Sequence, residues 1–304
     1  MKELKNKIHY WCPEVTRYPL TGKHVTAAVL DTGIAAHPDL APRLLGWKDC
    51  VNGERHCYDD NGHGTHVAGI LGGDGKCSGR QYAGIAPEVS IIGVKVLDEK
   101  GDGQIENVIS GIQYVLDEQK RSRIRIANIS LGTLPHPGNE EEERLLFWVE
   151  RLWDAGIVVV TAAGNMGPDA GSITLPGISR KVITVGACDT FTGQRGMKAV
   201  PAYSGCGPTL ECIKKPDVSA PGNRVFSCNF RYPSTSRFPY IGKNGTSMAT
   251  PVISGAAALL LQKYPDMSNM EMKLRLWDSC DNAGLPENWQ GHGRINIQKF
   301  LSAK

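Results

Sequence analysis

The 304-residue chain has no run of about 18 or more apolar residues, the length that a membrane-spanning helix needs. Its formal net charge of +3 is too small to indicate a nucleic-acid partner. The basic stretch 120–125 has no aromatic residues beside it for stacking, so we interpret it as a solvated connection between a helix and a strand. Residues 1–8 are basic but lack the apolar stretch of a signal peptide. We expect a cytoplasmic protein, unless an upstream leader has been removed, that binds neither membrane nor nucleic acid.

Regularly spaced cysteines are also missing. The nine cysteines are odd in number and include no Cys-x-x-Cys pair, which counts against a zinc site and favours free thiols in a reducing compartment. Cys50 with Cys57 and Cys206 with Cys212 are close enough in sequence for local disulfides, and that alternative stays open. No cysteine follows a glycine-rich turn beside a candidate histidine, so a thiol nucleophile is not favoured.

Strand-like and helix-like segments alternate along the chain. Continuous apolar runs indicate buried strands, whereas apolar residues at helical spacing and acidic first turns indicate helices. We predict strands at 24–30, 89–96, 124–131, 157–161 and 182–186, and helices at 65–71, 105–118, 140–153, 252–261 and 270–277. Such alternation is typical of an α/β fold with a mostly parallel central sheet and helices on both faces. Residues 1–20 are predicted to be an extended arm on a single domain of residues 21–304.

Three polar residues stand where acyl-transfer chemistry would need them. Ser247 lies between a glycine-bearing turn and an apolar helix, and the unpaired N–H groups at a helix start favour an oxyanion. Asp31 ends an apolar strand, and His63 stands in a glycine-flanked turn. An acid that orients an imidazole, an imidazole that moves a proton and a hydroxyl that attacks form a catalytic triad. Pro251 is expected in the first helical turn, where a missing N–H costs little.

Each of these residues has an alternative interpretation. Ser247 alone could be a helix N-cap, and Asp31 could cap a turn. Asp-Thr-Gly also occurs in aspartic proteases, but those combine two such motifs and this chain has one. His63 and His66 lie one helical turn apart and could share a metal, although we expect His66 to pack behind the site and to hydrogen-bond. The three residues together, in matching contexts, favour the triad.

The chain resembles the subtilisin family of serine proteases. The likeness rests on Asp31-Thr-Gly, His63-Gly-Thr-His, Ala-Ala-Gly-Asn165 and Gly-Thr-Ser247-Met-Ala-Thr-Pro, in the family's order, and it covers nearly the whole chain. It implies a serine endopeptidase that cleaves polypeptides through an acyl-enzyme and needs no cofactor for the chemistry. The cysteine content, the missing leader and Ala-Thr-Pro-Val after the serine are nearer to the bacterial intracellular type. A pseudoprotease scaffold, or an esterase or ligase with the same triad, stays open, as does the oligomeric state.

The resemblance also implies the remaining site residues. Asn165 would bind the developing oxyanion together with the Ser247 backbone N–H. The residues implied for substrate binding are Gly101, Asp102, Gly103, Ser130, Leu131 and Gly132 along the extended peptide, and Ala162, Ala163, Gly164 and Thr174 around the side chain before the scissile bond. The residues around that side chain are small and include no acid. We therefore predict a preference for large apolar or aromatic residues before the scissile bond over Lys or Arg.

Structural calcium is a further property of many family members. Asp39 matches one family calcium ligand. The loop 72–81 that follows lacks the family's Asn-rich calcium loop, however, and carries Lys76 and Arg80. Asp39 is therefore a possible calcium ligand, but the positive charges of Lys76 and Arg80 in the following loop count against calcium binding there.

Overall fold

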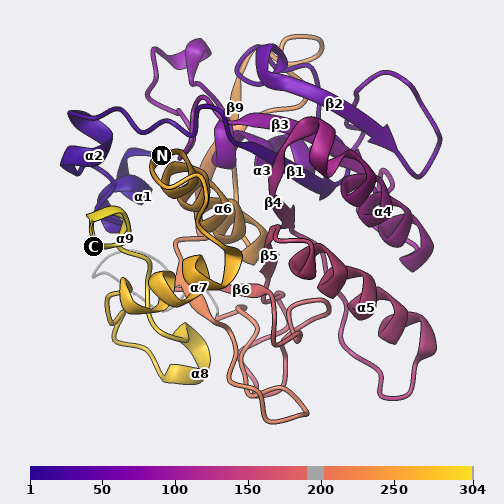
Figure 1. The fold of residues 1–304 in the computed structure, drawn as a ribbon. Coiled ribbons are helices and arrows are strands. Elements are labelled where there is room, and N and C mark those ends of the chain that lie inside the picture. Colours follow the sequence, from indigo (N-terminus) through magenta and orange to yellow (C-terminus); the bar gives the residue numbers. More distant parts are fainter. Residues whose placement is uncertain (190–201, 303–304) are drawn as a thin grey trace.

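The computed structural model describes residues 1–189 and 202–302. Within them, a seven-stranded sheet runs in the order β2-β3-β1-β4-β5-β6-β7, and each neighbouring pair is parallel (Figure 1). Its strands are β1 (Thr26–Asp31), β2 (Leu44–Asp49), β3 (Ser90–Lys95), β4 (Ile124–Ile129), β5 (Val158–Ala162), β6 (Ile183–Ala187) and β7 (Val218–Ala220), and an antiparallel pair is formed by β8 (Val225–Cys228) and β9 (Tyr240–Lys243).

Helices cover both faces of the sheet. They are α1 (Lys2–Lys7), α2 (Pro13–Thr16), α3 (His63–Gly72), α4 (Ile105–Ser122), α5 (Glu140–Asp154), α6 (Thr246–Lys263), α7 (Asn269–Asp278), α8 (Glu287–Gln290) and α9 (Ile297–Ser302), with 3-10 turns η1 (Ala41–Arg43) and η2 (Lys76–Ser78). The pair α4 and α5 packs on one face, and the pair α3 and α6 packs on the other (Figure 1). Because both faces are covered, β1, β5 and β6 are buried at every position. The predicted α/β fold is confirmed.

The strand order places a topological switch point between β1 and β4. From β1 the chain continues to β2 and β3 on one side, and later to β4 and the following strands on the other. Ligands of open α/β sheets bind at the carboxyl ends of the strands at such a point. Leu30 pairs with Ile129 across this boundary, so Asp31 and Ser130, the next residue of each strand, lie side by side at the carboxyl edge.

The first 20 residues are not extended, and that prediction was wrong. α1 and α2 are short helices, and Leu4, Ile8 and Tyr10 are buried in the main core. The Tyr10 hydroxyl donates to the Ile85 carbonyl at 2.9 Å, and the Ile297 N–H donates to the Ile8 carbonyl at 2.8 Å. The two ends of the chain therefore lie side by side (Figure 1). Helices of six and four residues are too short to show a helical period in sequence.

The helix that carries Ser247 begins earlier than predicted. α6 starts at Thr246, so Pro251 lies inside the helix rather than in its first turn, which corrects the prediction for Pro251. Proline has no N–H to donate to the carbonyl four residues back, which here belongs to Ser247. That carbonyl instead accepts a hydrogen bond from Ser130 Oγ at 3.5 Å. The proline thus leaves the Ser247 carbonyl available to the end of β4.

All nine cysteines lie in the described residues and are free thiols, so neither Cys50 with Cys57 nor Cys206 with Cys212 is bonded. Among the described helices, none combines the length and the apolar character that crossing a bilayer requires.

Candidate active site

Asp31 and His63 meet at the carboxyl edge of β1. His63 Nδ1 lies 2.7 Å from Asp31 Oδ1. Asp31 is completely buried, whereas the His63 side chain is 25% exposed. A carboxylate can only accept here, so it holds the proton on Nδ1 and leaves the lone pair on Nε2, which can then act as a base. This is the geometry that an acid orienting a general base requires.

Gly64 permits the close approach of α3 to the end of β1. A β-carbon at this position would lie 2.2 Å from the Gly33 carbonyl oxygen and 3.0 Å from Asp31 Cβ. Any side chain at 64 would therefore push the first turn of α3, and His63 with it, away from Asp31.

Asp59 fixes the turn that presents His63, and the sequence analysis missed it. Its Oδ1 accepts from Thr32 Oγ1 at 2.9 Å, from the Asn61 N–H at 3.1 Å and from the Gly62 N–H at 2.7 Å; its Oδ2 accepts from the Thr65 N–H at 2.9 Å and from Thr65 Oγ1 at 2.5 Å. Thr32 Oγ1 in turn accepts from the Gly64 N–H at 2.9 Å. One buried carboxylate thus ties the end of β1 to the start of α3. Its signal in the sequence is an acid placed just before a glycine-rich turn.

Ser247 lies at the same edge of the sheet. It stands in the first turn of α6 and is 8% exposed. Its Oγ donates to the Ser130 carbonyl at 3.2 Å. Because Ser130 adjoins Asp31 across β1 and β4, and because α3 packs against α6, this contact places the serine beside the Asp31–His63 pair.

Asn165 is anchored to the helix that carries Ser247. It follows β5 after a turn in which Gly164 has a φ of +91°. Its Oδ1 accepts from the Thr246 N–H at 3.0 Å and from Thr246 Oγ1 at 3.1 Å. Since the backbone N–H can only donate, the amide oxygen faces Thr246 and the NH₂ group faces the other way, where it can donate to a substrate oxygen. This anchor was not predicted.

His66 packs behind the site, as predicted. Its Nε2 lies 3.1 Å from the Val225 carbonyl and 3.0 Å from the Ile241 carbonyl, which binds α3 to the β8–β9 pair. Burial, followed by the charge of Lys243, lowers the pKa of His66 to about 3. The ring is therefore neutral at physiological pH, and its donating nitrogen is committed to the backbone rather than to a metal shared with His63.

A cleft of about 500 Å³ brings most of the predicted groove together. Its lining includes His63 with Asn61 and Thr32, and the predicted residues Gly101, Asp102, Gly103, Ser130, Leu131 and Gly132. Ala162, Ala163, Gly164 and Thr174 are not among the residues that line it. The structure therefore joins the two predicted peptide-binding edges to His63 in one cleft.

Thr174 occupies the space between Gly132 of the predicted peptide-binding edge and Gly164 of the predicted side-chain pocket. A β-carbon on Gly132 would lie 2.3 Å from Thr174 Oγ1, and one on Gly164 would lie 2.4 Å from Thr174 Cγ2. Both glycines are therefore needed to admit the threonine. Thr174 is 2% exposed, and its Oγ1 has no hydrogen-bond partner among the described residues.

The surroundings of Asp39 do not fit a calcium ion. Its Oδ1 accepts from the Cys77 N–H at 2.9 Å, and its Oδ2 accepts from the Tyr240 hydroxyl at 2.6 Å. Calcium takes about six to eight oxygen ligands, whereas here N–H and O–H donors face the carboxylate. The loop that could have supplied oxygens instead turns a backbone N–H toward Asp39.

An α/β sheet with an acid–histidine pair and a helix-borne serine at its switch point is the arrangement of a serine hydrolase. Comparison with known proteins shows which serine hydrolases the chain resembles, because the model of the subtilase family matches residues 22–293. The chain is 42% identical over 296 residues to the serine protease AprX of Bacillus subtilis (strain 168). The aligned region covers 93% of this chain and 67% of that protein. It is 37% identical to subtilisin DY of Bacillus licheniformis, with 91% and 90% covered.

Solved structures of proteases are similar to the chain as well. A psychrophilic protease, S41, superposes with a TM-score of 0.77 at 30% identity, over 91% of this chain and 93% of that one. A cold-adapted subtilisin-like serine proteinase superposes with a TM-score of 0.70 at 30% identity, over 91% and 88%. The chain therefore belongs to the subtilase family of serine proteases, as its motifs predicted.

Proposed function

We propose that the chain is an endopeptidase that cleaves polypeptides with Asp31, His63 and Ser247 as its catalytic triad. The observation that carries the proposal is the 2.7 Å contact between His63 Nδ1 and Asp31 Oδ1 at the strand end beside the Ser130–Ser247 contact. It supplies an oriented base next to a hydroxyl at a helix start, where a developing negative charge is stabilised.

The proposed reaction uses these groups in order. Ser247 Oγ leaves the Ser130 carbonyl, passes its proton to His63 Nε2 and attacks the substrate carbonyl carbon. The resulting oxyanion accepts hydrogen bonds from the Asn165 NH₂ group and the Ser247 N–H. His63 then gives its proton to the leaving amine, which departs and leaves an acyl-enzyme. Water, deprotonated by His63, hydrolyses the ester and restores Ser247.

The proposed substrate is an extended peptide of broad sequence. The cleft that contains His63 is lined by both 101–103 and 130–132, which supports main-chain pairing of these segments to an extended peptide. We propose a preference for a large apolar residue before the cleaved bond, because the implied walls, Ala162 to Gly164, are small and uncharged. Thr174, between Gly132 and Gly164, limits how deep that side chain can reach.

Labelling with a fluorophosphonate probe tests the triad directly. We expect the wild-type chain to be labelled on Ser247, and Ser247→Ala to lose both labelling and several orders of magnitude of peptidase turnover. Ser254→Ala is the matched control, because Ser254 is a buried serine of the same helix whose Oγ donates to Asn128. A wild-type chain that resists the probe would instead favour a pseudoprotease, and hydrolysis of esters without amides would favour an esterase.

We further propose that the protein works in a reducing compartment such as the cytoplasm. Nine free thiols, four of them buried, support this location. The chemistry proposed above uses only side chains and backbone groups of the chain, so no cofactor is proposed for it. Cell fractionation with an antibody tests the location: accumulation of the protein in the medium, with its cysteines paired, would contradict it.

A further inference from the structure

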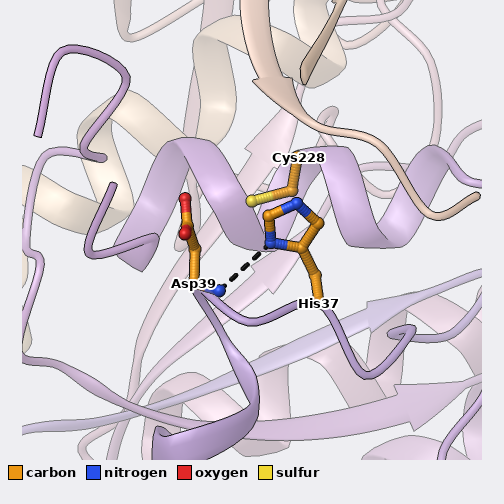
Figure 2. Close-up of side chains that lie close together, drawn as sticks. All are labelled: His37, Asp39 and Cys228. Atoms are coloured by element: carbon orange, nitrogen blue, oxygen red, sulfur yellow. Dashed lines mark hydrogen bonds between the residues drawn. The ribbon is translucent and has the colours of Figure 1, made fainter. Parts of the chain in front are cut away.

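A cluster of three potential metal ligands lies outside the catalytic residues, but its imidazole and its carboxylate are already hydrogen-bonded. Among the described residues, His37, Asp39 and Cys228 each place one ligand atom within 4.8 Å of the others (Figure 2). His37 Nε2 lies 3.0 Å from the Pro239 carbonyl, and Nδ1 accepts from the Asp39 N–H at 3.1 Å, so the ring keeps no free lone pair. Both Asp39 oxygens accept from other groups as well. We therefore interpret the cluster as a structural joint between the turn after β1 and the end of β8.

Tyr203 contacts the two turns that carry the proposed oxyanion donors, and the sequence analysis did not predict it. Its backbone carbonyl accepts from the Gly167 N–H at 2.9 Å, two residues after Asn165. Its hydroxyl accepts from the Gly245 N–H at 3.1 Å, two residues before Ser247. One residue thus connects the turn after β5 with the start of α6.

The Tyr203 hydroxyl belongs to a closed group of three hydrogen bonds. It donates to the Gly222 carbonyl at 3.2 Å, and the Gly245 N–H donates both to this carbonyl, at 2.9 Å, and to the hydroxyl. Gly222 is held in turn by Asp189, whose Oδ1 accepts from the Gly222 N–H at 2.9 Å. Burial, followed by the charge of Asp189, raises the pKa of Tyr203. The phenol therefore keeps its proton at neutral pH and can donate and accept at the same time.

Gly245 is the point at which this group acts on the oxyanion donors. It is the N-cap of α6 and has a φ of +144°, a conformation open mainly to glycine. A β-carbon on Gly245 would lie 3.5 Å from Asn165 Nδ2, so its backbone runs directly beside the side-chain donor. The Thr246 N–H, one residue on, donates to Asn165 Oδ1 at 3.0 Å. Movement of Gly245 would therefore shift Asn165 and the Ser247 N–H relative to each other.

We propose that Tyr203 is a positioning residue for the oxyanion hole. Its hydroxyl holds Gly245 at the start of α6, and its carbonyl holds Gly167 in the turn of Asn165, so both donors keep a fixed separation. Oxyanion donors must lie about 2.7–3.1 Å from the developing charge, and glycine at a turn has little stiffness of its own. The proposal rests on the function proposed above and adds to it a residue that acts through Gly245 and Asn165.

Tyr203→Phe tests the hydroxyl while it keeps the ring and the bond from the Gly167 N–H to the carbonyl. Since the Gly222 carbonyl still accepts from Gly245, the donors should be loosened rather than lost. We expect kcat to fall roughly tenfold, with KM within about twofold of the wild type. A peptide aldehyde adds to Ser247 Oγ and places its oxygen where the oxyanion forms, so its affinity should fall by a similar factor. The peptide alcohol of the same sequence cannot add to the serine and should bind unchanged.

Tyr10→Phe is the matched control. The Tyr10 hydroxyl likewise bonds to the backbone, since it donates to the Ile85 carbonyl at 2.9 Å, but it lies in the N-terminal segment. Urea unfolding should show a comparable loss of stability in both variants. Tyr10→Phe should nevertheless keep the kcat and the aldehyde affinity of the wild type.

Fluorophosphonate labelling of Ser247 separates this proposal from the function on which it rests. If Ser247 is labelled and Tyr203→Phe matches Tyr10→Phe in kcat and in aldehyde affinity, the positioning role is refuted while the triad stands. A fall confined to KM, or an equal loss of affinity for the aldehyde and the alcohol, would also refute it, because the hydroxyl would then act on substrate binding. A wild-type chain that resists the probe would overturn both.

Discussion

Replacing Asp59 by asparagine should separate positioning of the general base from overall stability. Among the described residues, Asp59 makes no hydrogen bond to Asp31 or His63, yet it accepts one hydrogen bond from Thr32 at the end of β1 and four from the turn and helix start that present His63. Asparagine has nearly the same shape as aspartate, but an NH₂ group, which donates, replaces one of the two acceptor oxygens. If the amide oxygen keeps the three bonds of Oδ1, the buried Thr65 N–H faces an NH₂ group and loses its acceptor.

The size of the effect follows from these contacts. A buried donor left without a partner costs about 1–3 kcal/mol, and the remaining bonds lose the extra strength of a charged acceptor. We therefore expect Asp59→Asn to lower the free energy of unfolding by roughly 2–4 kcal/mol. A loosened first turn of α3 moves His63 relative to Ser247, and a shift near 1 Å can cost about 10²-fold in turnover.

Asp49 provides a matched control. It is also a buried carboxylate at a strand end, and it accepts from the N–H groups of Val51, Asn52 and Glu54 and from the Tyr58 hydroxyl. Asp49→Asn should destabilise the protein to a similar extent while its kcat stays close to that of the wild type.

Urea unfolding and steady-state kinetics on one peptide measure both quantities. For Asp59→Asn we expect the loss mainly in kcat, with little change in KM, because the groove residues 101–103 and 130–132 are not bonded to Asp59. Equal kcat in the two variants, at comparable stability, would refute the claim that Asp59 acts by placing His63.

Three further predictions concern single side chains. Asn165→Leu should lower kcat at nearly constant KM by about the 10²–10³-fold known for loss of the matching subtilisin donor, and a fall confined to KM would contradict that role. Because burial lowers the pKa of His66 from 6.5 to about 3, the unfolded chain binds a proton that the folded chain refuses, so stability is fully present above pH 6.5 and declines below it. The loss should reach about 2 kcal/mol at pH 5 in urea unfolding, and His66→Gln should show a flatter dependence. Thr174→Gly should raise kcat/KM for Phe over Ala before the cleaved bond by roughly tenfold, and an unchanged ratio in peptides that differ only there would contradict a limiting role for Thr174.

The sequence predicted the strands of five or six residues that lie inside the sheet and are covered on both faces. β1, β3, β4, β5 and β6 were found within two residues of their ends, because strands covered on both faces are uninterrupted apolar runs. β2 was missed, since this edge strand alternates half-buried and exposed residues and ends in Lys48 and Asp49. The strands β7, β8 and β9 have only three or four residues, too few for a pattern.

The residues of the candidate site also differ in whether the sequence alone could predict them. Asp31, His63 and Ser247 carry recognisable local patterns, so a sequence can propose them. The anchoring of Asn165 by Thr246 and the bonds from Asp59 to Thr32 and Thr65 depend on which loops meet in space. The consequence of Pro251 was equally hidden, because the freed carbonyl of Ser247 matters only when another strand end lies against it.

That strand end has a consequence for how the resting hydroxyl is held. The Ser130 carbonyl accepts a hydrogen bond from Ser247 Oγ, and the Ser130 hydroxyl donates one to the Ser247 carbonyl. Ser130 also lines the cleft. A peptide laid along residues 130–132 would need a backbone acceptor there and would compete with Ser247 for the Ser130 carbonyl. The contact would then work as a latch: an incoming chain displaces the alcohol and frees it to turn toward the imidazole. A substrate-bound structure in which Ser247 Oγ still donates to Ser130 would rule the latch out.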